Sequence, residues 1–249
     1  MARYLFFSDL HLADGSKIDD FHPEKIPLFL RFAKAIKNSD FDGVFVLGDI
    51  YELWQGLGSQ KQRLSKAKKV YKPIVDFLEK NTVELYGNHD RKRKYLDPWV
   101  LKNKLLEKDG VRIWIEHGDR FDRYSRSFLG RLFAELFSVI EYFFPEKIQE
   151  SIEMFFEKIL RKITPRDPNY PGDFSEYEIG AKKLFAEKNC DLVILGHTHQ
   201  PLKKIWFENG KEKIYLNSGA WIKNQQDYVI VDTIKKIYEV RSYNGEEKI

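Results

Sequence analysis

The sequence predicts an α/β core that is followed by antiparallel strands. Short apolar runs alternate with segments of helical periodicity, which is the pattern of strands separated by helices. Five of the apolar runs end in clusters of polar residues, and open α/β sheets bind their ligands at the carboxyl ends of strands. The length of 249 residues suits a single domain, 1–249, that carries an insertion.

The expected elements follow from these periodicities. Buried strands are expected at Tyr4–Phe7, Val44–Leu47, Val83–Tyr86, Val111–Glu116 and Leu192–Leu195. Helices are expected at Pro23–Lys37, at about Gln60–Lys80, which is strongly basic, and at about Ser175–Lys188. The alternating tail contains further strand candidates at Lys203–Phe207, Lys213–Leu216, Tyr228–Val231 and Lys236–Arg241.

Residues Arg126–Ile163 interrupt this alternation. Two apolar faces with helical spacing, separated by Pro145, predict a helical hairpin within an insertion of about 124–174. One interpretation is ordinary core packing of the hairpin. The other is an apolar lid over the ligand site that receives acyl chains or touches a bilayer surface, since Phe155, Phe156 and the flanking basic residues fit an interfacial helix.

The composition excludes several classes of protein. With 43% hydrophobic and 32% charged residues, the chain is too apolar for a disordered protein and too charged for a membrane-embedded one. Neither a secretory leader nor a membrane-spanning run is expected. The single cysteine, Cys190, excludes an internal disulfide and fits a reducing cytoplasm. The net charge of +4 is too small to indicate nucleic acid as a partner.

The polar residues at the five strand ends form a set with metal-binding chemistry. Carboxylates and imidazoles together suit Mn, Fe, Zn or Ni rather than Ca or Mg alone. Each cluster alone is weak evidence, but the whole set exceeds the needs of one metal. Two metals that share a carboxylate can bind phosphate oxygens and acidify a water, which indicates hydrolysis of a phosphate ester or anhydride. The set comprises Asp9, His11, Asp49, Asn88, His89, His117, His197 and His199.

These clusters, in this order, resemble the motif set of the calcineurin-like metallophosphoesterases. The motifs are Asp9-Leu10-His11, Gly48-Asp49, Gly87-Asn88-His89-Asp90, His117-Gly118-Asp119 and Gly196-His197-Thr198-His199. The resemblance implies a four-layer sandwich of two mixed β-sheets flanked by helices, with two metals between the sheets. By motif match, one metal is held by Asp9, His11, Asp49 and His199. The other is held by Asn88, His117, His197 and the shared, bridging Asp49.

Other segments resemble the bacterial UDP-2,3-diacylglucosamine pyrophosphohydrolases of lipid A biosynthesis. They are the segment Gly48–Trp54, the pair Gly196–Pro201 and Tyr215–Trp221, and the helical insertion between the His117 and His197 motifs. This resemblance implies hydrolysis of UDP-2,3-diacylglucosamine to UMP and 2,3-diacylglucosamine 1-phosphate. His89 departs from the best-known branch, which has arginine there, but histidine is the general superfamily form.

Roles are expected for several residues around the metal ligands. His89 is expected to assist catalysis by hydrogen bonding to a phosphoryl or leaving oxygen, with Asp90 orienting its ring; the alternative is a structural histidine. Asp119 is expected to support a metal ligand. His22 and the basic run Arg91–Lys94 are expected on surface loops, where the basic run could attract an anionic substrate. Substrate contacts are expected from Asn88, His89, Asp122 and His197.

The leading hypothesis is a hydrolase with two Mn²⁺ ions per chain, or other divalent transition metals, acting on a nucleotide-lipid substrate. It would be cytoplasmic and peripheral on the cytoplasmic face of the bacterial inner membrane, with no protein partner evident. One alternative is a soluble phosphodiesterase or phosphatase that acts on small nucleotides, against which the apolar insertion argues. The weak net charge disfavours a nuclease, and the complete ligand set disfavours a non-enzymatic scaffold.

Overall fold

The computed structural model describes residues 2–16, 19–122, 176–246 and 248–249. Their strands form two five-stranded sheets, with strand orders β10-β9-β1-β2-β3 and β4-β5-β6-β8-β7. The first sheet consists of β1 (Arg3–Phe7), β2 (Gly43–Leu47), β3 (Val83–Leu85), β9 (Asp227–Asp232) and β10 (Ile237–Ser242). The second consists of β4 (Asn103–Lys108), β5 (Val111–Glu116), β6 (Leu192–Leu195), β7 (Pro201–Glu208) and β8 (Lys211–Ser218).

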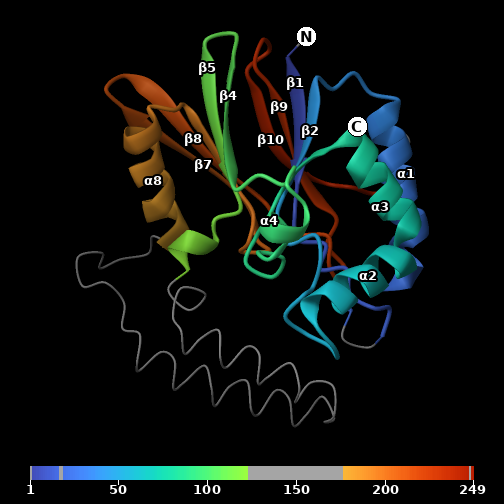
Figure 1. Ribbon diagram of the computed structural model, residues 1–249. Helices are drawn as coiled ribbons and strands as arrows, with labels where there is room; N and C mark the ends of the chain where they lie inside the picture. The colour runs from blue at the N-terminus through green and yellow to red at the C-terminus, as the bar shows by residue number, and fades with distance from the viewer. Residues whose placement is uncertain (1, 17–18, 123–175, 247) are drawn as a thin grey trace.

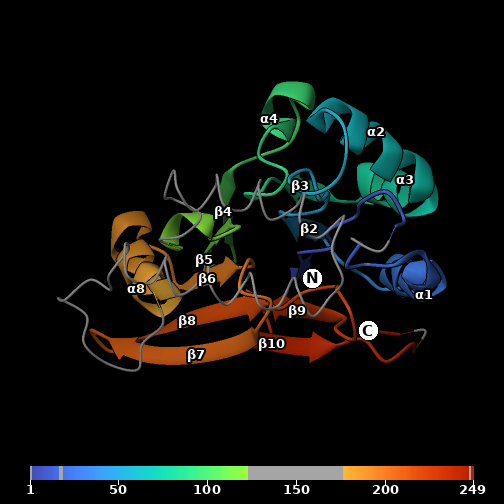
Figure 2. The same cartoon turned by 90° about the horizontal axis from the view of Figure 1, so that it is seen from below.

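Helices cover the outer faces of both sheets, so the described chain has four layers (Figures 1 and 2). Three helices lie outside the first sheet: α1 (Ile26–Lys37), α2 (Gln60–Val70) and α3 (Lys72–Asn81). The helix α8 (Glu176–Lys188) packs outside the second sheet, against β6 and β8. The four-layer sandwich of two mixed sheets, expected from the sequence, is therefore confirmed.

The strands that are covered on both faces contribute side chains to two hydrophobic cores. Along β1, Leu5 and Phe7 pack toward the helices, whereas Phe6 packs between the two sheets. Successive side chains of a strand point to opposite faces, so a strand that is covered on both faces is apolar throughout. The uninterrupted apolar runs of β1, β2 and β6 are explained by this double burial.

Two differences from the expected elements have local causes. The basic helical stretch divides at Tyr71, and Pro73 lies in the first turn of α3, where its missing N–H costs no helix hydrogen bond. Strand β4 is not among the expected strands because its half-exposed sequence lacks a clear apolar alternation. It pairs antiparallel with β5 across Asp109-Gly110, both at positive φ, and this turn signal would have revealed the hairpin.

The predicted helical hairpin at Arg126–Ile163, and the insertion 124–174 that contains it, lie outside the described residues. Phe155 and Phe156 belong to this part of the chain. Within the described residues, no helix combines the length and the apolar character that are needed to cross a bilayer.

The expectation of a solvated loop at Arg91–Lys94 is wrong for Arg93. This residue begins the short helix α4 (Arg93–Leu96) and its side chain is only 2% exposed. Its Nη2 donates to Glu84 and lies 3.2 Å from Asp97 Oδ2, and its guanidinium stacks on the ring of Tyr51. A buried cation needs paired carboxylates, and this network attaches α4 to the first sheet.

Replacing Arg93 with methionine should lower the free energy of unfolding by about 3–5 kcal/mol, because the buried Glu84 then loses its cationic partner. Urea denaturation of the purified variant measures this loss. Arg241→Met is the matched control, since Arg241 pairs with Glu239 at the surface, where ion pairs contribute little. A similar small effect of both substitutions would contradict the structural role given to Arg93.

Candidate metal centre

The chemistry-bearing residues follow the carboxyl ends of five strands, which meet at one edge of the two sheets. Strands β1, β2 and β3 are parallel in one sheet, and β5 and β6 are parallel in the other. Backbone hydrogen bonds join neighbouring loops within the first sheet, from Asp9 N to Gly48 O and from His11 N to Asp49 O. A further bond from His197 N to Asp9 Oδ2, 3.0 Å long, joins the two sheets across the site.

The loops hold several of these residues in an unfavourable backbone conformation. Positive φ angles, between 47° and 70°, occur at Asp9, His11, Asp49, His197 and His199. Non-glycine residues adopt this region at a cost of roughly 1–3 kcal/mol each, and they concentrate at functional sites. The strain indicates that the loops are shaped to aim these side chains inward.

One cluster joins the loop that follows β1 to the loop that follows β6. The ring nitrogen His199 Nε2 lies 3.3 Å from Asp9 Oδ1 and 3.2 Å from His11 Nε2. His11 Nδ1 donates to Glu52 Oε2, 3.2 Å away, which leaves Nε2 as the ring atom that faces Asp9 and His199. The three groups lie close enough to hold a metal ion together.

A second cluster lies around His117. Its Nε2 is 3.0 Å from Asp49 Oδ2, 3.1 Å from Asn88 Oδ1 and 3.1 Å from His197 Nδ1. The other ring nitrogen, Nδ1, donates to the carbonyl of Leu47 at 2.8 Å, which orients the ring. Asp49, His117 and His197 can therefore hold a metal ion as well.

Asp49 lies between the two clusters. Its Oδ2, which is close to His117, is also 3.9 Å from His11 Nε2, and its Oδ1 accepts the backbone N–H of His89. The surrounding glycines leave room for it: a Cβ on Gly87 would collide with Asp49 and His117. One carboxylate thus lies within 3.9 Å of a ring nitrogen in each cluster.

The charge balance of the site fits divalent cations. Asp9 Oδ1 is buried and has no hydrogen-bond donor among the described residues, although two imidazoles face it. Asp49 and His117 are both buried, which opposes charge on each, but their mutual attraction dominates. His117 holds the pKa of Asp49 well below its usual range, and Asp49 raises the pKa of His117 to about 10. A metal ion replaces such protons when it binds.

His89 lies beside these two clusters, and with His11 and Glu52 it forms a third group of side chains close enough to hold a metal ion. Its ring stacks on Trp54 with a centroid distance of 4.3 Å, and its Nδ1 donates to Glu52 Oε2. The expectation that Asp90 orients this ring is wrong, because Asp90 accepts the backbone N–H groups of Gly87 and Ile50 instead. Asp90 therefore shapes the loop that carries His89.

Glu52 is a residue of the site whose role the sequence did not reveal. It is buried, and its Oε2 accepts hydrogen bonds from both His11 and His89, while its Oε1 accepts the backbone N–H groups of Trp54 and Gln55. Burial would raise the pKa of this carboxyl, but the charge of His89 outweighs it and holds the pKa below its usual range. The sequence signal for this role was an acidic residue three positions after Asp49, in the loop that follows β2.

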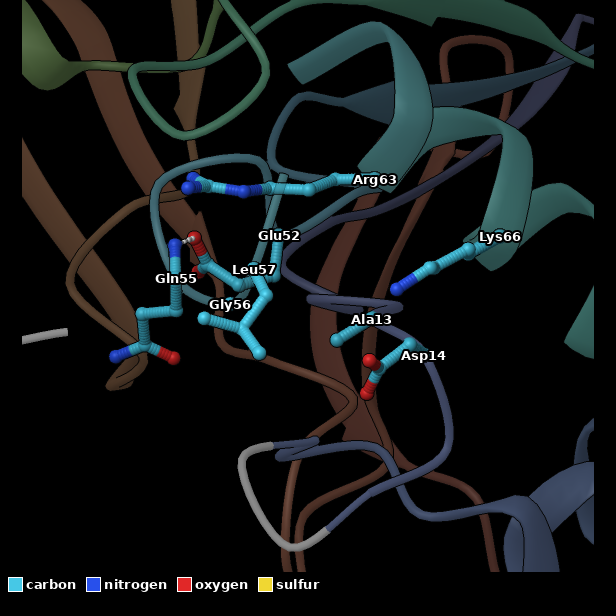
Figure 3. Close-up of a pocket in the computed structure, with 8 residues that line it drawn as sticks. All are labelled: Ala13, Asp14, Glu52, Gln55, Gly56, Leu57, Arg63 and Lys66. Carbon is cyan, nitrogen blue, oxygen red and sulfur yellow. Dashed lines mark hydrogen bonds between the residues drawn. The ribbon is translucent and has the colours of Figure 1, made fainter. Parts of the chain in front are cut away.

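A small pocket adjoins Glu52 on the side of α2 (Figure 3). Arg63 lies along one wall and donates to the carbonyls of Leu53 and Trp54 at 2.8 and 2.6 Å. Figure 3 shows the amino group of Lys66 extending toward Ala13 and Asp14 on the opposite wall. Helix α2 thereby holds the loop that positions Glu52 and Trp54.

Other predicted residues lie at the rim. Asp122 Oδ2 is 3.4 Å from His197 Nε2, and its role as a substrate contact stays a prediction. Tyr177 of α8, which sequence reasoning missed, places its ring 5.7 Å from that of His197. Asp119 pairs with Arg91 and adds negative charge near His117. His22 is exposed, as expected.

Comparison with known families agrees with this geometry. The calcineurin-like phosphoesterase family matches residues 2–201, which include every strand-end motif. The chain belongs to this family. Its members are metal-dependent phosphoesterases, so the chain is a phosphoester hydrolase of this class.

Curated relatives and solved structures give narrower similarities. The UDP-2,3-diacylglucosamine hydrolase of Photobacterium profundum is 26% identical over 231 residues, or 87% of this chain and 88% of the relative. The enzyme of the same name from Neisseria meningitidis serogroup C (strain 053442) is 24% identical over 241 residues, or 91% and 93%. A novel archaeal phosphodiesterase of known structure has 16% identity and a TM-score of 0.46, covering 97% of this chain and 99% of its own.

Replacing Glu52 with glutamine should weaken both divalent-metal affinity and turnover by about 10- to 100-fold, because one carboxylate oxygen orients both His11 and His89. Titration against a fluorescent chelator gives the affinity. Glu84→Gln is a matched control, a buried carboxylate that pairs with Arg93. Unchanged metal affinity in Glu52→Gln would show that Glu52 does not orient His11.

Proposed function

We propose that the chain hydrolyses the pyrophosphate bond of UDP-2,3-diacylglucosamine, giving UMP and 2,3-diacylglucosamine 1-phosphate for lipid A biosynthesis. The intact set of carboxylates and imidazoles that Asp49 connects supports phosphoester hydrolysis. The choice of substrate is supported by relatives named UDP-2,3-diacylglucosamine hydrolase, which align with about nine-tenths of the chain. A lipid substrate implies work in the cytoplasm at the inner-membrane surface.

The proposed cofactor is a pair of Mn²⁺ ions. Asp9, His11 and His199 would hold one ion, and Asn88, His117 and His197 the other, with Asp49 shared between them. When bound, such a pair supplies positive charge to the phosphoryl oxygens and acidifies the attacking water. Because each cluster contains at least one carboxylate and two imidazoles, both suit a transition metal.

His89 is the proposed catalytic group of the chain. Burial opposes its protonation, but the negative charge of Glu52 outweighs burial and raises the pKa of His89, which favours the protonated ring. With Nδ1 occupied by Glu52, the proton on Nε2 is left to donate to the substrate. Stacking on Trp54 fixes the plane of the ring, and a positioned imidazolium stabilises negative charge on the phosphoryl or leaving oxygen.

The decisive experiment supplies the Mn²⁺-loaded chain with UDP-2,3-diacylglucosamine and identifies the products by mass spectrometry. Release of UMP together with the lipid 1-phosphate is the expected result. Bis(p-nitrophenyl) phosphate and small nucleotides serve as comparison substrates. Efficient cleavage of small nucleotides without release of UMP from the lipid would overturn the proposal and favour a soluble phosphodiesterase or phosphatase.

Asp49→Ala should remove both metal ions, because Asp49 is the carboxylate that reaches both clusters. Elemental analysis after dialysis measures metal content per chain. Asp9→Ala is the control and should impair one site only, since Asp9 belongs to a single cluster. One ion retained at full occupancy in Asp49→Ala would rule out the shared position.

His89→Ala should retain both metal ions and lose about 10²–10⁴ in turnover, the range for a general acid or charge-stabilising group. The reason is that His89 lies beside the clusters, attached to Glu52 and Trp54. Steady-state kinetics and elemental analysis of the same preparation separate the two effects. Metal loss in parallel with activity would instead make His89 a ligand.

A further inference from the structure

The segment that follows His89 presents large apolar side chains to solvent. The exposed fraction is 76% for Tyr95, 42% for Leu96 and 86% for Trp99. Aromatic residues of this size are usually buried, and exposed groups of them mark interaction sites. We call the exposed side chains of Lys92, Lys94, Tyr95, Leu96 and Trp99 the α4 surface.

The α4 surface is held in place from its inner side. The buried Arg93 attaches α4 to Glu84 of β3, and the carboxylate of Asp97 pairs with Arg93 at 3.2 Å. Lys68 of α2 lies 3.8 Å from the same carboxylate. None of the exposed aromatic side chains takes part in this network. The network therefore anchors α4 without using the exposed aromatic side chains.

Positive charge surrounds these aromatic side chains. Lys92 and Lys94 are exposed, and Lys94 Nζ lies 4.6 Å from the centroid of the Tyr95 ring. The neighbouring helix α2 adds exposed lysines at 61, 66 and 69. Tryptophan and tyrosine among lysines are typical of surfaces that lie in the headgroup region of a bilayer, where rings sit at the interface and lysines meet anionic lipids.

The α4 surface lies on the same edge of the molecule as the candidate metal centre. Its first residue, Lys92, comes three positions after His89, and Figure 1 shows α4 and α2 at the lower edge of the sheets, where the strands β1, β2 and β3 end. In contrast, exposed Ile234 follows β9 at the opposite end of β1, next to Ala2. Exposed Phe207 lies near the far end of β7.

We propose that the α4 surface docks the protein onto a bilayer that contains anionic phospholipids, with the metal-centre edge turned toward the lipid. The reason for such docking rests on the proposed function, because a diacylated nucleotide sugar resides in such a bilayer. The evidence for docking is separate: exposed aromatic side chains on a segment that Arg93 anchors, neighbouring lysines and the shared edge.

The test measures binding of the full chain to vesicles without substrate. Flotation should show binding to vesicles of phosphatidylethanolamine with phosphatidylglycerol, and much less to phosphatidylcholine alone. The double variant Tyr95→Ser/Trp99→Ser should bind roughly 10- to 100-fold more weakly, because two aromatic side chains no longer leave water. The control Phe207→Ser/Ile234→Ser removes comparably exposed apolar groups at other edges and should bind as the wild type does.

A charge variant tests the basic surround independently. Lys92→Gln/Lys94→Gln should weaken binding by about fivefold for each lysine at low salt, and the difference should shrink at high salt. The Tyr95→Ser/Trp99→Ser variant should hydrolyse bis(p-nitrophenyl) phosphate at the wild-type rate, since this soluble substrate needs no bilayer. Circular dichroism should show that both double variants are folded.

The docking proposal is overturned if the wild-type protein does not float with the anionic vesicles, or if the Tyr95→Ser/Trp99→Ser variant binds them as the wild type does. It is also overturned if the Phe207→Ser/Ile234→Ser control loses as much vesicle binding as the Tyr95→Ser/Trp99→Ser variant. Loss of a dimer in Trp99→Ser, seen by analytical ultracentrifugation with vesicle binding intact, would assign the surface to a second copy of the chain. Vesicle binding without hydrolysis of UDP-2,3-diacylglucosamine would overturn the proposed function and leave docking standing.

Discussion

The site depends on a buried carboxylate that two sheets surround. Asp49 follows β2 in one sheet and contacts His117, which follows β5 in the other. Burying this negative charge is costly unless cations or donors face it, and the imidazoles and the His89 N–H do so. The strained loops, the close-packed glycines and the parallel strand ends all serve to bring those partners to it.

Much of this arrangement was predictable because buried parallel strands have a simple signature. Runs such as Leu5-Phe6-Phe7 are apolar throughout since both faces are covered, and the polar residue that follows must lie at the ligand edge. The candidate ligands were recognised in this way, and the structure brings Asp9, His11 and His199 together, and likewise Asp49, His117 and His197.

What escaped prediction depends on contacts between segments. The sequence places Asp90 next to His89, but the backbone directs the Asp90 carboxylate to Gly87 and Ile50, while Glu52 reaches His89 from another loop. Arg93 stands in a basic run typical of a solvated loop, and only its approach to Glu84 allows its burial. Strand β4 has too weak an alternation and becomes a strand by pairing with β5.

The two clusters of the candidate metal centre share a feature with covalent cross-links. Each draws groups from both sheets: His11 and His199 meet although 188 positions separate them in the chain. A cation held there ties the two layers of the sandwich together, much as a bridge between distant cysteines would. Because such a cation would bind the folded chain more tightly than the unfolded chain, its removal would loosen the packing between the sheets as well as the loops around it. The availability of divalent metal in the cell would then govern the lifetime of the fold, in addition to its activity.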